Sequence, residues 1–261
     1  MKSFSKMVYP YAVWMIIMII VPMLMIVLYA FTTQGNDVLT FQFTLSNFAR
    51  FFSDNVFPSV LWRSLKMAVI TTLICILIGY PAAYAMAKSK PHSQAVMVLL
   101  ITLPMWINML VRTYAWKGIL SDSPLSAEAQ VYIGMVYNFL PFMILPVYNA
   151  LSRIDENVVN AAHDLGAGPL QTFLRVTLPL SVPGIVSGVT MVFVPALTTF
   201  AISTMLGGSK ILLIGNVIEQ EFTLSYNWNL GSGLSIVLMV FIVINMIVTA
   251  ITDRDEEGAH A

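Results

Sequence analysis

Long apolar stretches alternate with short polar connections along this chain. A membrane-spanning helix needs about 20 mostly apolar residues, and six stretches reach that length: residues 9–32, 65–87, 95–116, 129–151, 181–206 and 233–252. Inside a bilayer each stretch must satisfy its own backbone polar groups, which a helix does. The pattern therefore predicts an all-α integral membrane protein with six transmembrane helices.

Composition supports the bilayer as the solvent. Hydrophobic residues make up 58% of the 261 residues and charged residues only 10%, whereas an average soluble domain carries about 25% charged residues. A net charge of zero gives no electrostatic support for nucleic-acid binding. With a single cysteine, Cys75, and three histidines, the sequence indicates no metal site.

The placement of lysine and arginine gives an orientation. Lys88 and Lys90 lie in the short connection between the second and third stretches, which the positive-inside rule places in the cytoplasm. The apolar run after Lys2 and Lys6 is too long for a signal-peptide core, so we expect it to be a retained first span. The prediction is a multi-pass protein of the cell (cytoplasmic) membrane with both termini in the cytoplasm.

This arrangement divides the chain into three parts. Residues 1–59 hold the first helix and an outer loop, and residues 60–252 hold a core of five helices. A polar cytoplasmic connection, residues 152–180, interrupts that core. Residues 253–261 form an acidic cytoplasmic tail.

The connection between the fourth and fifth stretches has a clear local pattern. Asp155 is a good helix N-cap, and the helix should run to about Leu165. Gly166 gives the backbone freedom that a helix stop requires, and Pro169 is suited to the first position of a second short helix. Pro179 should end that helix. We expect two short helices joined by a glycine elbow.

Both short helices carry apolar side chains that a solvated linker does not need. They are Val158, Val159, Ala162 and Leu165 in the first helix, and Leu170, Phe173, Leu174 and Leu178 in the second. An ordered cytoplasmic element with small and apolar residues suits docking against another protein. The alternative is a solvated linker in which the alanines and glycines have no role. The helix cap, the glycine elbow and the Leu-Pro pair all indicate an ordered element, and this favours docking.

A motif in this connection resembles a known family. The pattern Asn160-Ala-Ala, three residues, Gly166, nine residues, Val176-x-Leu178-Pro179 is similar to the Glu-Ala-Ala loop of ATP-driven (ABC) importer permeases, with Asn160 in the place of the glutamate. The resemblance implies a type I ABC-importer permease fold and a loop that couples to a separate ATPase. The implied coupling residues are Asn160, Ala161, Ala162, Asp164, Leu165, Gly166, Pro169, Leu170, Phe173 and Pro179.

Three further segments, 77–87, 134–148 and 205–222, resemble the first (B-type) permease of spermidine/putrescine importers. The connection 121–128 is shorter than expected for that subfamily. The resemblance implies a pore subunit that carries polyamines into the cytoplasm by alternating access. It implies as partners a second homologous permease, an ATPase dimer and an extracytoplasmic substrate-binding receptor.

The same resemblance implies that this chain is not itself an enzyme and holds no cofactor, with ATP and Mg bound on the partner ATPase. The sequence also lacks a phosphate-binding loop of the Walker type. Two alternatives stay open: an ABC permease for another small solute, and an ion-coupled secondary transporter. The second would need an ionisable residue deep in a span, and the sequence shows none near a span centre.

The fifth stretch offers candidates for the translocation path. Pro195 lies near its middle, and Thr198, Thr199 and Ser203 follow. One interpretation is a packing kink with hydroxyls bonded to their own backbone. The other is a break that lines the pore with polar groups. The sequence does not decide between them.

Four polar residues near the predicted outer side complete the candidates. Asn108 and Arg112 lie in the outer part of the third stretch, where Arg112 can snorkel to the interface or contribute to an outer gate. Glu219 and Glu221 lie in the connection before the last stretch. They form either a solvated face or a negative outer mouth that concentrates a cationic substrate.

Overall fold

The computed structural model describes residues 10–11, 13–33, 42–54 and 56–259. Side chains are not described for residues 209 and 248–259. Lys2, Lys6, the predicted span start at residue 9, most of the outer loop and residues 260–261 of the predicted tail lie outside the described residues. Among those described, the secondary structure is helical apart from one isolated bridge between Thr32 and Phe43.

The prediction of an all-α membrane protein is confirmed. Five helical stretches are long and apolar enough to cross a bilayer: Val13–Ala30, Val56–Ala87, Ala127–Leu151, Pro169–Thr198 and Trp228–Ile247. A sixth candidate is a bent pair, Pro91–Trp106 and Met109–Leu120, whose halves meet at 90°. The described chain therefore holds six spans when the bent pair counts as one.

The chain divides into two compact units. The first unit combines Met1–Val60 with Val217–Val243, and the second combines Leu61–Asn216 with Ile244–Ala261. The longest helices, α4 (Val56–Ala87) and α12 (Trp228–Ala259), continue from one unit into the other.

In the first unit, two asparagines hold the end of the first span. This span consists of a π-helical turn, Ile16–Ile20, followed by α2 (Val21–Ala30). The amide of Asn229, at the start of α12, donates hydrogen bonds to the carbonyls of Tyr29 at 3.0 Å and Thr32 at 2.8 Å. Asn47, in α3 (Ser46–Ser53), donates to the carbonyls of Ala30 and Thr32. Carbonyls at a helix end lack intrahelical partners, and these amides supply them.

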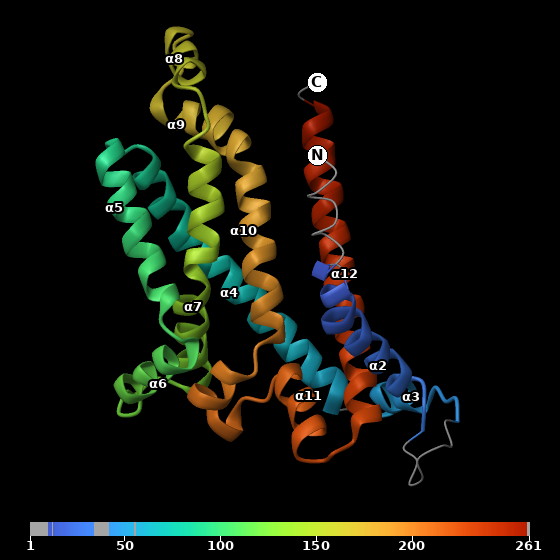
Figure 1. Cartoon of the computed structure of the whole chain (residues 1–261). Helices are drawn as coiled ribbons and strands as arrows, with labels where there is room; N and C mark the ends of the chain where they lie inside the picture. The colour runs from blue at the N-terminus through green and yellow to red at the C-terminus, as the bar shows by residue number, and fades with distance from the viewer. Residues whose placement is uncertain (1–9, 12, 34–41, 55, 260–261) are drawn as a thin grey trace. The chain divides into compact units, whose positions relative to one another are not determined.

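The second unit is built around α7 (Ala127–Leu151) and α10 (Leu178–Thr198), which lie side by side (Figure 1). Residues on one stripe of α7 are buried at every fourth position: Val131, Met135, Phe139, Met143, Val147 and Leu151. A spacing of four keeps side chains on one face of a helix. This stripe makes α7 the central helix of the unit.

The prediction of one continuous helix over residues 95–116 is wrong. The structure has α5 (Pro91–Thr102), a 3₁₀ turn (Leu103–Trp106) and then α6 (Met109–Leu120). The backbone is extended at Ile107, with ψ 138°. The side chain of Asn108 then accepts a hydrogen bond from the Leu110 N–H at 2.8 Å, which caps a new helix.

The predicted boundary at Pro179 is also wrong. The second short helix does not end there, because α9 (Pro169–Thr172), a π-helical turn (Phe173–Thr177) and α10 form one helical stretch. Pro179 lies in the first turn of α10. The π turn resets the hydrogen-bond pattern, so the missing N–H of proline is tolerated. The fifth span therefore begins within the predicted coupling connection.

The far end of the fifth span comes earlier than residue 206. The helix α10 ends at Thr198, and Thr199 is extended with ψ 139°. A second short helical segment follows over residues 201–207. Pro195 therefore lies in the last turn of α10 rather than near the middle of the span. Its carbonyl accepts from the Thr199 N–H at 2.9 Å.

Candidate coupling loop and translocation path

The first helix of the predicted coupling loop is α8 (Glu156–Asp164). The carboxylate of Asp155 accepts a hydrogen bond from the Asn157 N–H at 2.9 Å, so the predicted N-cap is confirmed. At the other end Gly166 adopts φ +85°, a conformation that favours glycine. Its N–H donates to the carbonyl of His163 at 2.9 Å. The predicted glycine elbow is therefore present.

The loop presents apolar side chains to its surroundings. Leu165 is 90% exposed and Leu170 is 70% exposed. Beside them lies a hollow of about 260 Å³, lined by Ala162, Leu165, Gly166, Ala167, Gln171, Thr172, Arg175 and Val176. Exposed leucines beside a hollow are compatible with docking, and docking of an ATPase here stays a prediction. The predicted residues Asn160, Ala161 and Asp164 are also exposed on α8.

Phe173 connects the loop to the membrane helices. Its ring meets those of Tyr80 and Tyr84, both on α4, edge to face at centroid distances of 5.9 Å and 5.6 Å. The Tyr80 hydroxyl shares a 2.9 Å hydrogen bond with the hydroxyl of Ser181 on α10. Sequence reasoning missed the two tyrosines. Their spacing of four residues, which places both on one helix face, was the available signal.

The connection after α4 lies on the same side of the second unit as the coupling loop. The Gln94 amide donates to the carbonyls of Ala87 and Ser89, and its oxygen accepts from the Tyr148 hydroxyl at 3.2 Å. A hollow of about 190 Å³ joins the two connections, with Lys88, Ser152, Glu156 and Thr177 among its lining residues. Figure 1 shows α8 and α9 at one end of α7 and α10, and α6 at the other.

The predicted path residues are mostly engaged in local packing. The Thr198 hydroxyl donates to the Val194 carbonyl at 3.0 Å, within its own helix. Thr199 is only 9% exposed, and Ser203 is fully buried. Asn108 serves as the cap of α6. A role for these residues in translocation stays a prediction.

Arg112 and a neighbouring asparagine carry buried polar atoms. The guanidinium carbon of Arg112 lies 5.8 Å from the centroid of the Tyr137 ring, within the range of a cation–π contact. Within the described chain, its Nε and Nη1 atoms and the Oδ1 atom of Asn138 are buried without hydrogen-bond partners. Asn138, which is 2% exposed, donates to the Gly134 carbonyl at 2.8 Å.

The predicted outer-mouth carboxylates lie on a helix, which corrects their placement in a connection. Glu219 and Glu221 belong to α11 (Ile214–Thr223). Each residue turns an α-helix by about 100°, so side chains two residues apart diverge by about 200°. The Thr223 hydroxyl donates to the carbonyl and the carboxylate of Glu219. A shared negative mouth stays a prediction.

Asn216 is a buried centre of hydrogen bonding that sequence reasoning missed. Its Oδ1 atom accepts from the Ser203 hydroxyl at 2.7 Å and the Leu213 N–H at 3.0 Å. Its amide donates to the Phe200 carbonyl at 3.0 Å and the Thr204 hydroxyl at 2.7 Å. This one side chain therefore holds the segment that follows the break after α10.

Asn216→Leu is expected to destabilise the chain by about 3 kcal/mol, because it leaves several buried polar groups without partners. The measurement is the thermal unfolding midpoint of the purified protein in detergent. Asn149→Leu, on an exposed position of α7, is the matched control and should stay close to wild type. Equal midpoints for the two variants would contradict the role given to Asn216.

The apolar helices, and the exposed, ordered loop between two of them, are those of a polytopic membrane protein. Residues 76–256 match the family described as binding-protein-dependent transport system inner membrane component. The chain belongs to this family. Among the residues described, no group of three side chains is arranged to hold a metal ion.

Comparison with individual proteins gives a more specific resemblance than the family as a whole. The chain is 40% identical over 250 residues to a spermidine/putrescine transport system permease protein, PotB, of Haemophilus influenzae, which covers 88% of this chain and 87% of the relative. It is 36% identical over 255 residues to the protein of the same name from Escherichia coli K12, covering 90% and 92%. The resemblance seen in the sequence is therefore confirmed.

Solved structures confirm the permease fold. A chain of a bacterial alginate ABC transporter, solved in complex with a periplasmic protein, superposes with a TM-score of 0.73 at 15% identity, covering 94% of this chain and 92% of that one. A chain of the MetNI methionine ABC transporter gives 0.62 at 18% identity, covering 76% and 94%. At such identities the likeness concerns the fold alone.

Proposed function

We propose that this chain is a transmembrane pore subunit of an ATP-driven importer that carries polyamines, such as spermidine and putrescine, into the cytoplasm. The observation that carries the proposal is the identity of 36–40% with relatives named for that transport, along about nine-tenths of the chain. The exposed coupling loop supports it independently, because a pore subunit without an ATPase site needs a docking surface for one.

The partners follow from the same proposal. They are a second homologous permease, an ATPase dimer that binds ATP and Mg, and an extracytoplasmic receptor that delivers the substrate. In this proposal the loop 155–179 docks the ATPase, so that the loop and the Lys88–Lys90 connection face the cytoplasm. Six spans would then put both termini on the same side. The positive-inside rule supports this orientation, and the two connections lie on one side of the second unit.

The geometry suggests how movement of the loop reaches the membrane helices. The helical stretch Pro169–Thr198 runs from the loop into the fifth span without a break. A displacement of the loop therefore acts directly on α10. Phe173 passes the same displacement to α4 through Tyr80 and Tyr84. Closure of the ATPase dimer would swing these helices and open the path outward, and reopening would reverse the movement.

Uptake of labelled spermidine tests the proposal. Cells that lack polyamine import receive the partner subunits with and without this chain. We expect uptake that requires the chain and that excess putrescine inhibits, whereas excess amino acids or sugars do not. No uptake by a membrane-inserted chain with its ATPase bound would overturn the polyamine substrate. Failure to bind any ATPase would overturn the coupling role and favour an ion-coupled transporter.

A further inference from the structure

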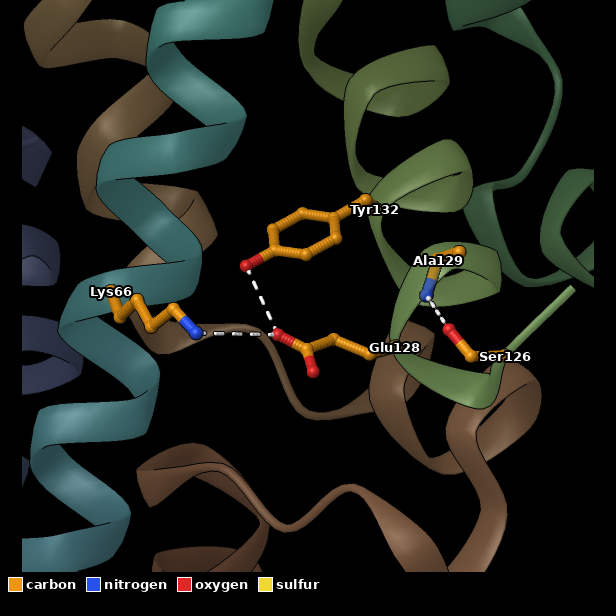
Figure 2. A network of polar contacts seen from close by, with 5 residues as sticks. All are labelled: Lys66, Ser126, Glu128, Ala129 and Tyr132. Atoms are coloured by element: carbon orange, nitrogen blue, oxygen red, sulfur yellow. Dashed lines mark hydrogen bonds and ion pairs between the residues drawn. The ribbon is translucent and has the colours of Figure 1, made fainter.

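One ion pair is found among the side chains that the structure describes. The Nζ atom of Lys66 lies 3.8 Å from the Oε1 atom of Glu128. The Tyr132 hydroxyl donates to the same oxygen at 3.4 Å. Figure 2 shows Lys66 reaching from α4 toward α7, where Glu128 and Tyr132 lie one helical turn apart.

These three side chains lie at the end of the second unit opposite the coupling loop. A helix rises 1.5 Å per residue, so Glu128 lies about 35 Å along α7 from Leu151. Lys66 lies about 32 Å along α4 from Ala87. The apolar core of a bilayer is about 30 Å thick. With the loop in the cytoplasm, the ion pair therefore lies at the outer boundary of the membrane.

Local contacts hold Glu128 at the start of α7. The Ser126 hydroxyl accepts a hydrogen bond from the Ala129 N–H at 3.2 Å and caps the start of α7, as Figure 2 shows. Glu128 is thereby held in the first turn, where the helix dipole stabilises a carboxylate. The Tyr132 hydroxyl lies beside one carboxylate oxygen, at a long hydrogen-bond distance of 3.4 Å. A carboxylate with a neighbouring phenol is suited to hold an ammonium group.

The ion pair is poorly suited to a structural role alone. Its two side chains are 56% and 45% exposed, and its length of 3.8 Å exceeds the roughly 2.8 Å of a strong charge-assisted hydrogen bond. Exposed pairs of this kind stabilise a fold only weakly. An open, weak and displaceable pair at the outer end is the arrangement expected of a position that a ligand can enter.

We propose that Glu128 and Tyr132 form a binding position for a primary ammonium group of the substrate at the outer end of the pore, and that Lys66 occupies it when no substrate is present. This inference rests on the proposed function. The lysine side chain consists of four methylene groups that end in a primary ammonium. The aminobutyl arm of putrescine and spermidine has the same structure, so a geometry that accepts Lys66 also accepts the end of the substrate.

The proposal predicts opposite effects for the two members of the ion pair. Lys66→Met removes the internal competitor and keeps an apolar side chain, so spermidine should bind about two- to fivefold more tightly, in line with the small stabilisation of an exposed pair. Glu128→Gln removes the carboxylate, and binding should weaken about tenfold or more. Tyr132→Phe should weaken binding less, because the carboxylate stays.

The measurement is equilibrium binding of labelled spermidine, at low salt, to the complete permease–ATPase complex in lipid nanodiscs without the receptor. Asp122→Asn is the matched control, because it removes a carboxylate from the connection just before α7 and leaves the pair intact; its affinity should equal that of wild type. The double variant Lys66→Met/Glu128→Gln should bind as weakly as Glu128→Gln. Assembly of each complex, checked by size-exclusion chromatography, shows that the variants are folded.

Two results would overturn the inference. If Lys66→Met and Glu128→Gln both weaken binding, the pair only ties α4 to α7. If Glu128→Gln binds as wild type does, the carboxylate does not contact the substrate. In either case spermidine uptake by the wild-type transporter would still support the proposed function. A wild-type transporter that takes up no polyamine would instead remove the proposed function, and this inference with it.

Discussion

Gly166→Pro is expected to abolish uptake by the assembled transporter while the chain still reaches the membrane in near wild-type amounts. Gly166 has φ +85°, whereas proline is fixed near −65°. Proline also lacks the N–H that Gly166 donates to the carbonyl of His163 at 2.9 Å. The elbow would therefore lose its shape. Insertion should continue, because the substitution lies outside the membrane spans.

Gly168→Ala is the matched control for this substitution. Gly168 has φ −70°, which any residue adopts, and a Cβ added there meets no atom within 4 Å. We expect uptake close to wild type. The measurements are uptake of labelled spermidine and co-purification of the ATPase. Normal uptake by Gly166→Pro, or an equal loss in both variants, would show that the elbow does not couple the two subunits.

Local signals allowed the first short helix and the glycine elbow of the loop to be predicted from sequence. An N-cap such as Asp155 and a helix-ending glycine such as Gly166 act through neighbours a few residues away. The information needed to place them therefore lies within a short window of sequence. The same holds for the length of the apolar stretches, because the thickness of the bilayer sets it.

Breaks inside apolar stretches could not be predicted in this way. Pro104 precedes the break between α5 and α6, but Pro141 and Pro146 lie inside α7, which continues through both. In a bilayer a proline can lie at a helix break or inside a continuous helix, provided that neighbouring groups replace the lost hydrogen bonds. Whether the helix breaks depends on the cap at Asn108 and on contacts with other helices. The pattern of apolar residues contains neither.

Contacts between distant segments were missed for a related reason. Asn216 holds groups that lie up to 16 residues away, and Lys66 meets Glu128 across two helices. In the sequence nothing near Lys66, Glu128 or Asn216 indicates which distant group each side chain meets. The spacing of four residues brings Tyr132 to Glu128, but only the packing of α4 against α7 brings Lys66 there, so the ion pair could not be identified from spacing.

Gly184→Val is expected to destabilise the second unit by about 3 kcal/mol, at the upper end of what overpacking costs. A Cβ added at Gly184 would lie 2.5 Å from the Cβ of Ala150 and 2.8 Å from the carbonyl oxygen of Pro146. Both atoms are held by the α7 backbone, so neither can turn aside as a flexible side chain would. Small residues permit this close approach of helices in membranes. The measurement is the thermal unfolding midpoint in detergent.

Gly188→Ala, one turn further along α10, tests whether the rigidity of the neighbour decides the effect. The nearest atom to an added Cβ there is the sulfur of Met143, at 2.7 Å, and a methionine side chain can change rotamer. The matched variant at the rigid site is Gly184→Ala, and we expect a clearly smaller loss for Gly188→Ala than for Gly184→Ala. Equal losses would mean that crowding alone matters. A larger loss at Gly184 would mean that the close approach of the α7 and α10 backbones near the loop, rather than crowding by a flexible side chain, determines the stability there.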